Sequence, residues 1–323
     1  MKKKISILGI VFLLITLGVA IRSSAADLKS VRIGYLQNDI HQLACWVALE
    51  KGFYTQEGLE VKVAGIFKAG PELMSAFAAG ALDMGYVGIA PATAAVANKA
   101  ARVVVLAQAN SEGSALVIRK DSPAQTLGDL KGKSLAVPGH STVQDFLLRK
   151  AIAKAQLTDQ QFSIMVIKPP EMIAALRNKD IEGFIAWEPF PAKAATGDVG
   201  RVLSPSREIW PDHPCCVLAA DTQFLGSRPE EAKKMVRAHV RATDFINQHP
   251  KEIIPIALKY TGMDEKTILQ ALKNVKYAYA LNREAEKEYV HFLSQWKFIK
   301  VEDGSAFVTR FVNLQLLNEI LKK

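Results

Sequence analysis

The 323-residue sequence contains none of the short motifs that most often indicate catalysis. We find no GxSxG nucleophile elbow, no HExxH pair and no GxxxxGK phosphate loop. Basic clusters with interleaved aromatic residues are also absent, so nucleic-acid binding has little support. There is no internal repeat and no low-complexity tract. The composition, with 49% hydrophobic and 23% charged residues, is that of an ordinary globular protein, and we expect a non-enzymatic one.

Cysteine is scarce: the chain has only Cys45, Cys215 and Cys216, and three thiols cannot all pair within one chain. Cys45 falls on the apolar stripe of an expected helix, which indicates an inert core residue. The pair after His213 and Pro214 leaves several interpretations open: a strained vicinal disulfide, a thiol near a ligand, a metal or redox site, or two small buried residues that start a strand. We favour the buried residues. A zinc site needs four ligands, which these neighbours do not supply, so we expect no metal and no cofactor.

Long apolar runs are absent except at the N-terminus, where three lysines precede ISILGIVFLLITLGVAI and RSSAAD. This order is typical of a secretory signal peptide, here residues 1–26 with cleavage near Ala25 or Ala26. An uncleaved membrane anchor is the alternative, because the run approaches spanning length. No cysteine follows the run, so a lipid anchor is not indicated. Loss of its four basic residues lowers the net charge from +9 to +5, and we expect a soluble, exported protein.

Short apolar runs of strand length alternate with helical runs over much of the remaining chain. Examples are VRIGYL at 31–36, HQLACWVALEKG at 41–52 and LEVKVAG at 59–65. Strand–helix–strand order builds parallel sheet, whose strand ends face a common crevice. We therefore predict an α/β protein with two units, at about 27–118 and 119–214. A strand near 216–220 is expected to return to the first unit, and the chain from Arg228 onward is predicted to be almost wholly helical.

Turns that follow the expected strands of the first unit are candidates for ligand contacts. They cover 37–42, 67–71 and 87–91, and the residues selected there are Asn38, Asp39, His41, Gln42, Lys68, Gly88, Ile89 and Ala90. Glycine at position 88 would let a ligand approach the backbone closely, and the Lys68 ammonium could neutralise an anion. The alternatives are structural: Asp39 caps a helix, His41 lies on the surface, and Lys68 is an ordinary exposed lysine.

Four runs of the sequence, taken in order, resemble the signatures of one family. They are EKGFYTQEGLEVKV, GALDMGYVGIAPA, DLKGKSLAVPGHSTVQDFLLRKAI and ALRNKDIEGFIAWEPFPAKA. The family comprises periplasmic substrate-binding proteins of ABC importers for nitrate, aliphatic sulfonates and taurine, and it also contains binders of the thiamine pyrimidine precursor. Each run alone is weak evidence, but four in the right order behind a signal peptide make a strong case. The resemblance covers nearly all of the mature chain.

The resemblance implies a two-lobed periplasmic binding fold of type II, with a ligand cleft between lobes that close about a hinge. Lobe 1 would contain 27–118 and 215–323, and lobe 2 would contain 119–214. In lobe 2 the family places ligand contacts at His140, Ser141, Thr142, Trp187 and Glu188. The first three lie at a predicted helix start, where backbone amides attract an anion. The structural alternatives are a helix cap at Ser141 or Thr142, a core position for Trp187 and a hinge contact for Glu188.

By resemblance, the expected function is that of the solute-binding component of an ABC importer. It would capture a small ligand, foremost a sulfonate, nitrate or related anion, and deliver it to a permease in the inner membrane. We expect a periplasmic monomer without enzymatic activity. Asp39 and Glu188 suit a purely anionic ligand poorly and suggest an amine or another donor. The alternatives are a sensory protein, or a binder or synthase of a thiamine-pyrimidine-type precursor; the synthases use histidine and clustered cysteines with iron, which His213, Cys215 and Cys216 resemble faintly.

Overall fold

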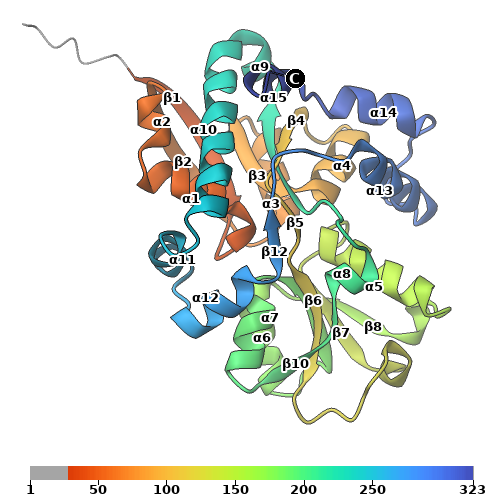
Figure 1. Ribbon diagram of the computed structural model, residues 1–323. Coiled ribbons are helices and arrows are strands. Elements are labelled where there is room, and N and C mark those ends of the chain that lie inside the picture. The colour runs from red at the N-terminus through yellow and green to blue at the C-terminus, as the bar shows by residue number, and fades with distance from the viewer. Residues whose placement is uncertain (1–27, 323) are drawn as a thin grey trace, which may run out of the picture.

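The computed structural model describes residues 28–322, which form two lobes that are each built on a five-stranded sheet (Figure 1). The mixed α/β architecture predicted from the sequence is confirmed. The expected signal peptide, residues 1–26, lies outside the described residues. Within 28–322, no helix is both long enough and apolar enough to cross a bilayer.

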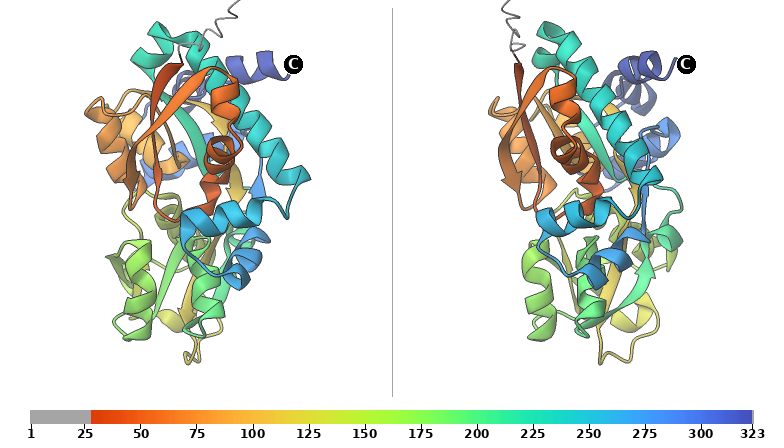
Figure 2. Two further views of the ribbon diagram at one scale, coloured as in Figure 1. Left: turned by 90° about the vertical axis from the view of Figure 1, so that its left-hand side faces the viewer. Right: turned by 60° about the vertical axis from the view of Figure 1, so that its left-hand side comes forward.

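The sheet of lobe 1, at the top of Figure 1, has the strand order β2–β1–β3–β11–β4. Its strands are β1 (Lys29–Leu36), β2 (Leu59–Phe67), β3 (Met84–Gly88), β4 (Val103–Gln108) and β11 (Cys216–Asp221). β1 runs parallel to β2 and β3, whereas β11 runs antiparallel to β3 and β4. The predicted return of the chain to the first unit is therefore confirmed. Helices lie on both faces of this sheet (Figure 2), which explains why every residue of β3 is buried.

The sheet of lobe 2 has the order β10–β6–β9–β7–β8. Its strands are β6 (Ser114–Arg119), β7 (Ser134–Val137), β8 (Ser163–Val166), β9 (Gly183–Trp187) and β10 (Gly200–Pro205). β7 runs parallel to β8 and β9, and β6 runs antiparallel to β9 and β10. The carboxyl ends of β7 and β9 therefore point the same way and carry candidate ligand residues from two turns to one edge of the sheet.

Most helices of the two lobes follow strands, as the alternating pattern predicts. Those before residue 215 are η1 (Ile40–Gln42), α1 (Leu43–Glu50), α2 (Phe53–Gln56), α3 (Gly70–Ala78), α4 (Ile89–Ala97), η2 (Leu127–Leu130), α5 (Val143–Lys154), η3 (Asp159–Gln161), α6 (Pro169–Arg177), α7 (Phe190–Thr196) and α8 (Ser206–Ile209), where η marks a 3-10 helix. Both α3 and α6 begin with proline in the first turn and an acidic residue next to it. These residues are common at helix N-termini, where proline fits the backbone and an acidic side chain interacts favourably with the helix dipole.

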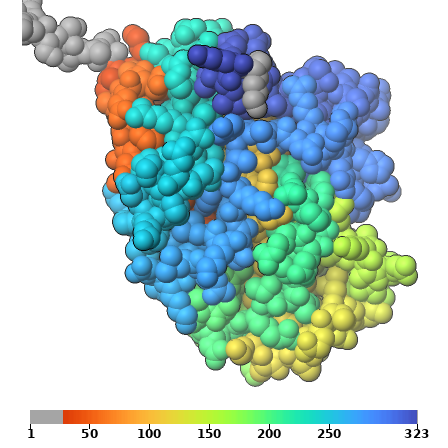
Figure 3. All heavy atoms as spheres, in the orientation of Figure 1, coloured from red at the N-terminus to blue at the C-terminus, as the bar shows by residue number. Residues whose placement is uncertain are grey.

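The C-terminal part is almost wholly helical, as predicted. Its helices are α9 (Thr222–Ser227), α10 (Pro229–Gln248), α11 (Ile253–Thr261), α12 (Glu265–Leu272), α13 (Arg283–Gln295), α14 (Gly304–Phe311) and α15 (Gln315–Ile320). These helices contact both lobes. The Thr267 hydroxyl of α12 lies 2.7 Å from that of Thr196 on α7, and the Tyr289 ring of α13 lies 4.3 Å from that of Phe146 on α5, centroid to centroid. On the face shown in Figure 3, the blue C-terminal residues extend over the junction of the lobes.

A small sheet lies where the chain crosses between the lobes, which is the position expected for a hinge. Strand β5 (Asn110–Glu112) pairs antiparallel with β12 (Val275–Tyr277) just before the chain enters lobe 2. The returning chain passes beside it, because the Cys215 amide donates 3.1 Å to the Asn110 carbonyl. Gly113 lies between β5 and β6 at a φ of +82°, and a Cβ there would come within 2.3 Å of His41 Nε2. The positive φ and the lack of space for a Cβ both require glycine at position 113.

Candidate functional site

The loop after β1 forms a buried polar layer. Asp39 caps η1, as the structural alternative expected: its Oδ1 accepts 2.9 Å from the His41 amide. Asp39 Oδ2 accepts 2.8 Å from Gln42 Nε2, and Gln42 Oε1 accepts 2.7 Å from the Leu36 amide. Asp39, His41 and Gln42 are fully buried, so the alternative of a surface His41 is wrong. Half-buried Asn38 turns the chain into this layer at a φ of 54°.

The return strand brings two thiols against the buried layer. His41 Nδ1 lies 3.3 Å from Cys215 Sγ and 4.0 Å from Cys216 Sγ. The opposite ring nitrogen, Nε2, lies 2.8 Å from the Gly113 carbonyl, which can only accept, so Nε2 carries a proton. Sequence reasoning missed this contact, because His41 and Cys215 are 174 residues apart and the local pattern drew attention to His213.

The charges in this cluster follow from its burial and pairing. Burial alone would raise the pKa of Cys215, but the hydrogen bond with Cys216 and the charge of His41 hold that pKa well below its usual range. Burial would likewise lower the pKa of His41, yet the charges of Asp39 and Cys215 raise it to about 9. Both shifts are in the direction that favours a Cys215 thiolate facing a His41 imidazolium. All three cysteines are free, and burial raises the pKa of Cys45, the expected core thiol, to about 12.

In lobe 2, the turn between β7 and α5 holds the residues that sequence analysis favoured for anion binding. Thr142 caps α5, because its Oγ1 accepts 3.2 Å from the Asp145 amide and donates 2.8 Å to the Gly139 carbonyl. The Asp145 carboxylate accepts the Ser141 amide at 3.0 Å. Thr142 is thus buried in its own cap, whereas Ser141 is half-buried and His140 is exposed.

A cavity of about 260 Å³ opens beside this turn, between the lobes. Lobe 2 contributes His140 and Ser141 to its lining. Lobe 1 contributes the facing sides of α3 and α4 and the turn after α4: Pro71, Met74, Ser75, Ala78, Pro91, Ala94, Ala95, Asn98 and Ala100. The lobe 1 wall is largely apolar and the lobe 2 rim is polar, which suits a small molecule with a hydrocarbon part and a polar head. Several of these wall residues stand four apart on one helix, and that spacing could have identified them in the sequence.

The predicted residues at the start of α4 lie behind the cavity. Gly88, Ile89 and Ala90 are buried, and the next residue, Pro91, reaches the cavity. A Cβ at Gly88 would lie 3.2 Å from both Pro91 and Val143 of lobe 2. The absence of a side chain at this position therefore lets the lobes approach each other closely.

Two ion pairs join the lobes. Lys68 Nζ lies 3.1 Å from Glu171 Oε1, and Lys168 Nζ lies 2.9 Å from Glu72 Oε1. Lys68 and Glu72 belong to lobe 1, whereas Lys168 and Glu171 lie at the start of α6 in lobe 2. Lys68 is therefore engaged across the junction, and the structure shows the lobes in contact, as in the closed state of a hinged protein.

Trp187 and Glu188 end β9 at the junction of the lobes. Trp187 is 2% exposed, and its Nε1 has no hydrogen-bond partner within residues 28–322. The Glu188 carboxylate accepts 2.7 Å from Asn274 Nδ2 and 3.1 Å from the Ala192 amide, and its carbonyl accepts the Ile40 amide of lobe 1 at 3.3 Å. Burial raises the pKa of Glu188 to about 7. Glu188 thus contacts lobe 1 and the C-terminal part, as a hinge contact would.

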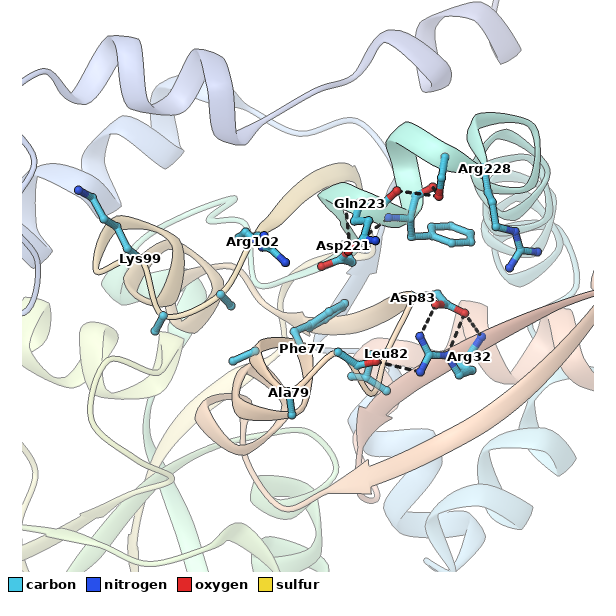
Figure 4. Close-up of a pocket in the computed structure, with 16 residues that line it drawn as sticks. Arg32, Phe77, Ala79, Leu82, Asp83, Lys99, Arg102, Asp221, Gln223 and Arg228 are labelled. Atoms are coloured by element: carbon cyan, nitrogen blue, oxygen red, sulfur yellow. Dashed lines mark hydrogen bonds and ion pairs between the residues drawn. The ribbon is translucent and has the colours of Figure 1, made fainter.

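A larger cavity, of about 590 Å³, lies in lobe 1 away from lobe 2 (Figure 4). Arg32 there pairs with Asp83 at 2.6 Å, and Arg102 and Asp221 also line the cavity. It lies at the amino ends of β3 and β4, whereas open α/β sheets bind ligands at the carboxyl ends. No predicted site residue lines it, so the cavity between the lobes is the better candidate.

Two α/β lobes that meet around a small cavity define the class of periplasmic binding proteins. The chain belongs to the NMT1-like family, whose model matches residues 24–259. It is 28% identical to a protein of Brucella abortus (strain 2308) that is named as a binding protein. This alignment of 254 residues covers 78% of this chain and 77% of the relative. It is also 28% identical to the taurine-binding periplasmic protein of Escherichia coli (strain K12), over an alignment of 230 residues that covers 68% of this chain and 70% of that protein. The periplasmic nitrate-binding protein NrtA from Synechocystis PCC 6803 shares the fold, with a TM-score of 0.82, 18% identity, and 92% and 89% coverage.

Proposed function

We propose that this protein is the solute-binding component of an ABC importer, and that it delivers a small organic anion to a permease. The cavity that both lobes share carries the proposal, because closure of the lobes would enclose a ligand there. The names of the taurine- and nitrate-binding relatives support an anionic ligand. Much of the cavity wall is apolar, so an aliphatic sulfonate suits it better than nitrate, which has no hydrocarbon part.

In this proposal, the start of α5 holds the sulfonate group. Amides in the first turn of a helix carry partial positive charge, and the Ser141 hydroxyl and His140 ring add donors on the cavity rim. The hydrocarbon part of the ligand would lie along Pro71, Met74 and Pro91. Trp187 Nε1 is a buried donor at the junction without a partner among residues 28–322, and it would serve a ligand that reaches further between the lobes.

The mechanism we propose is hinge closure. Lobe 1 would bind the hydrocarbon part first, and lobe 2 would then close on the anionic head. We assign 28–113 and 215–322 to lobe 1 and 114–214 to lobe 2, because β6 (Ser114–Arg119) pairs within the sheet of lobe 2; the boundary between 118 and 119 expected from the sequence falls too late. The ligand shifts the equilibrium because it contacts both lobes only in the closed state. We propose a periplasmic monomer without enzymatic activity, consistent with relatives that are named as binding proteins.

Isothermal titration calorimetry of the mature chain, from Asp27 onward, tests the function. Taurine or an alkanesulfonate is expected to bind, and His140→Ala combined with Ser141→Ala should weaken binding by about tenfold or more, since hydrogen bonds to a charged group contribute about 1.5–3 kcal/mol. His291→Ala, at an exposed histidine of α13, is the control and should bind normally. Unchanged affinity in the double variant would remove the α5 turn from the site. If nitrate or a pyrimidine binds and none of the sulfonates does, the proposed ligand class is wrong.

A further inference from the structure

Four potential metal ligands meet at the hinge, outside the cavity proposed for the anion. They are the carboxylate of Asp39, the imidazole of His41 and the thiols of Cys215 and Cys216. Each residue is at most 2% exposed. The ligand atoms of the histidine and the two cysteines all lie within 4.8 Å of one another.

The spacing of these atoms approaches that of a tetrahedral metal site. Metal–sulfur bonds of about 2.3 Å and metal–nitrogen or metal–oxygen bonds of about 2.0 Å place neighbouring ligand atoms about 3.3–3.8 Å apart. His41 Nδ1 lies 3.3 Å from Cys215 Sγ, 4.0 Å from Cys216 Sγ and 3.6 Å from Asp39 Oδ1. Cys216 Sγ lies 3.9 Å from Asp39 Oδ2. The ligand atoms of His41, Cys215 and Cys216 already form one group, whereas Asp39 lies at its edge and would have to move toward Cys215 to become the fourth ligand.

The groups behind these ligands hold them in the orientation that a metal requires. The hydrogen bond from His41 Nε2 to the Gly113 carbonyl directs Nδ1 toward the thiols. Gln42 and the His41 amide donate to the Asp39 carboxylate. Metal-binding histidines commonly donate their second ring N–H to a carbonyl or carboxylate, and metal-binding carboxylates are themselves hydrogen-bonded.

We propose that Asp39, His41, Cys215 and Cys216 form a binding site for one thiophilic metal ion of the zinc class. Two thiolates and an imidazole select soft or borderline ions over magnesium or calcium. Metal binding requires an unprotonated Nδ1 on His41 and both cysteines as thiolates, so protons held on these atoms would leave to solvent. The residues next to the cysteines in the sequence supply too few ligands for zinc, but the fold adds His41 and Asp39 from the loop after β1.

The ion would link the β1 loop of lobe 1 to the returning strand. This loop also touches lobe 2, because the Ile40 amide donates to the Glu188 carbonyl. The site would therefore stiffen the hinge side of the junction. It does not depend on the anion proposed above, and either proposal can fail alone.

The test measures zinc on the full mature chain. Because the site is buried, the protein is refolded under reducing conditions with and without Zn²⁺, freed of excess metal, and analysed by elemental mass spectrometry. We expect one zinc per chain and loss of binding in Cys215→Ser combined with Cys216→Ser. Cys45→Ser, at the buried cysteine outside the cluster, is the control and should keep the metal. Gln42→Leu should weaken affinity about 10–100-fold in competition with a chromophoric chelator, since Gln42 donates to Asp39 and would not itself contact the metal.

Substitution with Co²⁺ keeps the proposal testable if the cysteine variants do not fold. In the wild-type chain, thiolate-to-cobalt charge-transfer absorption is expected. Its absence from folded protein would overturn the site. Substoichiometric zinc in the reduced wild-type chain, or full zinc in the folded double cysteine variant, would overturn it as well.

Discussion

The two ion pairs between the lobes predict a measurable contribution to closure. Glu171→Gln combined with Lys168→Gln removes both pairs, leaves the net charge unchanged and alters only lobe 2. The lobe 1 partners are less suitable for substitution, because the Glu72 carboxylate also accepts the Lys68 amide at 3.0 Å. If the closed state binds the anion, loss of both pairs should weaken binding without unfolding the protein.

The expected magnitude is modest, because these side chains are in contact with water. Lys68 and Glu171 are 52% and 57% exposed, and Lys168 and Glu72 are 27% and 41% exposed. Exposed pairs contribute about 0.2–1 kcal/mol each, so the two together stabilise closure by about 1 kcal/mol. This free energy corresponds to a change of about fivefold in the closed-to-open ratio and at most about fivefold in the apparent Kd.

Calorimetry with the best sulfonate at low and high salt is the appropriate assay. The difference between the double variant and the wild type should shrink in about 1 M salt, where the Debye length falls to about 3 Å. Lys179→Gln combined with Asp121→Asn is the matched control, because this exposed pair, at 3.2 Å, lies within lobe 2. Equal affinities of wild type and double variant at low salt would show that the pairs do not support the state that binds ligand.

Two further predictions concern stability. His239 is buried between Tyr86 and the Gln108 carbonyl, and burial lowers its pKa from 6.5 to about 4. The unfolded chain therefore takes up the proton first. The stabilisation due to neutral His239 is complete above pH 6.5 and is lost as the pH falls toward 4, by about 3 kcal/mol. Urea unfolding at several pH values should show that His239→Gln removes this slope and that His291→Gln does not; parallel curves for wild type and His239→Gln would contradict the assignment. Thr142→Ala should cost about 1 kcal/mol in thermal unfolding because it removes the α5 cap, and Thr142→Ser should restore most of it; an unaffected Thr142→Ala variant would show that the cap contributes nothing.

Much of the fold could be predicted because the local signals agree with the tertiary structure. Buried strands such as β3 are short apolar runs, and glycine or polar turns follow them. The order of strands and helices then leaves few ways to arrange parallel sheet. The return of β11 to lobe 1 was predictable because an apolar run follows the second unit and precedes the long helical part. The cap at Thr142 also follows from local sequence, since a hydroxyl before a helix start satisfies free amides.

The candidate site was less predictable because its parts come from distant segments. Position at a strand end selected His140 and Ser141, which line the cavity, but it also selected Asp39 and His41, which are buried in a separate layer. No local pattern pairs His41 with Cys215, since their contact depends on the returning strand. Sequence alone likewise could not show that Lys68 meets Glu171 across the junction.

The hydrogen bonds around Gly113 indicate which contacts survive when the lobes open. Its carbonyl accepts 2.8 Å from the Glu188 amide, as part of the pairing of β6 with β9, and 2.8 Å from His41 Nε2. Rotation of lobe 2 as a body would keep the first bond, whereas the Ile40–Glu188 bond between the lobes, at 3.3 Å, is longer and has no sheet around it. Because Cys215 and Gly113 both lie on the crossing chains beside His41, the metal ligands would move little while the cavity opens. We therefore expect zinc to remain bound whether or not anion is present, which makes the two sites separable by experiment.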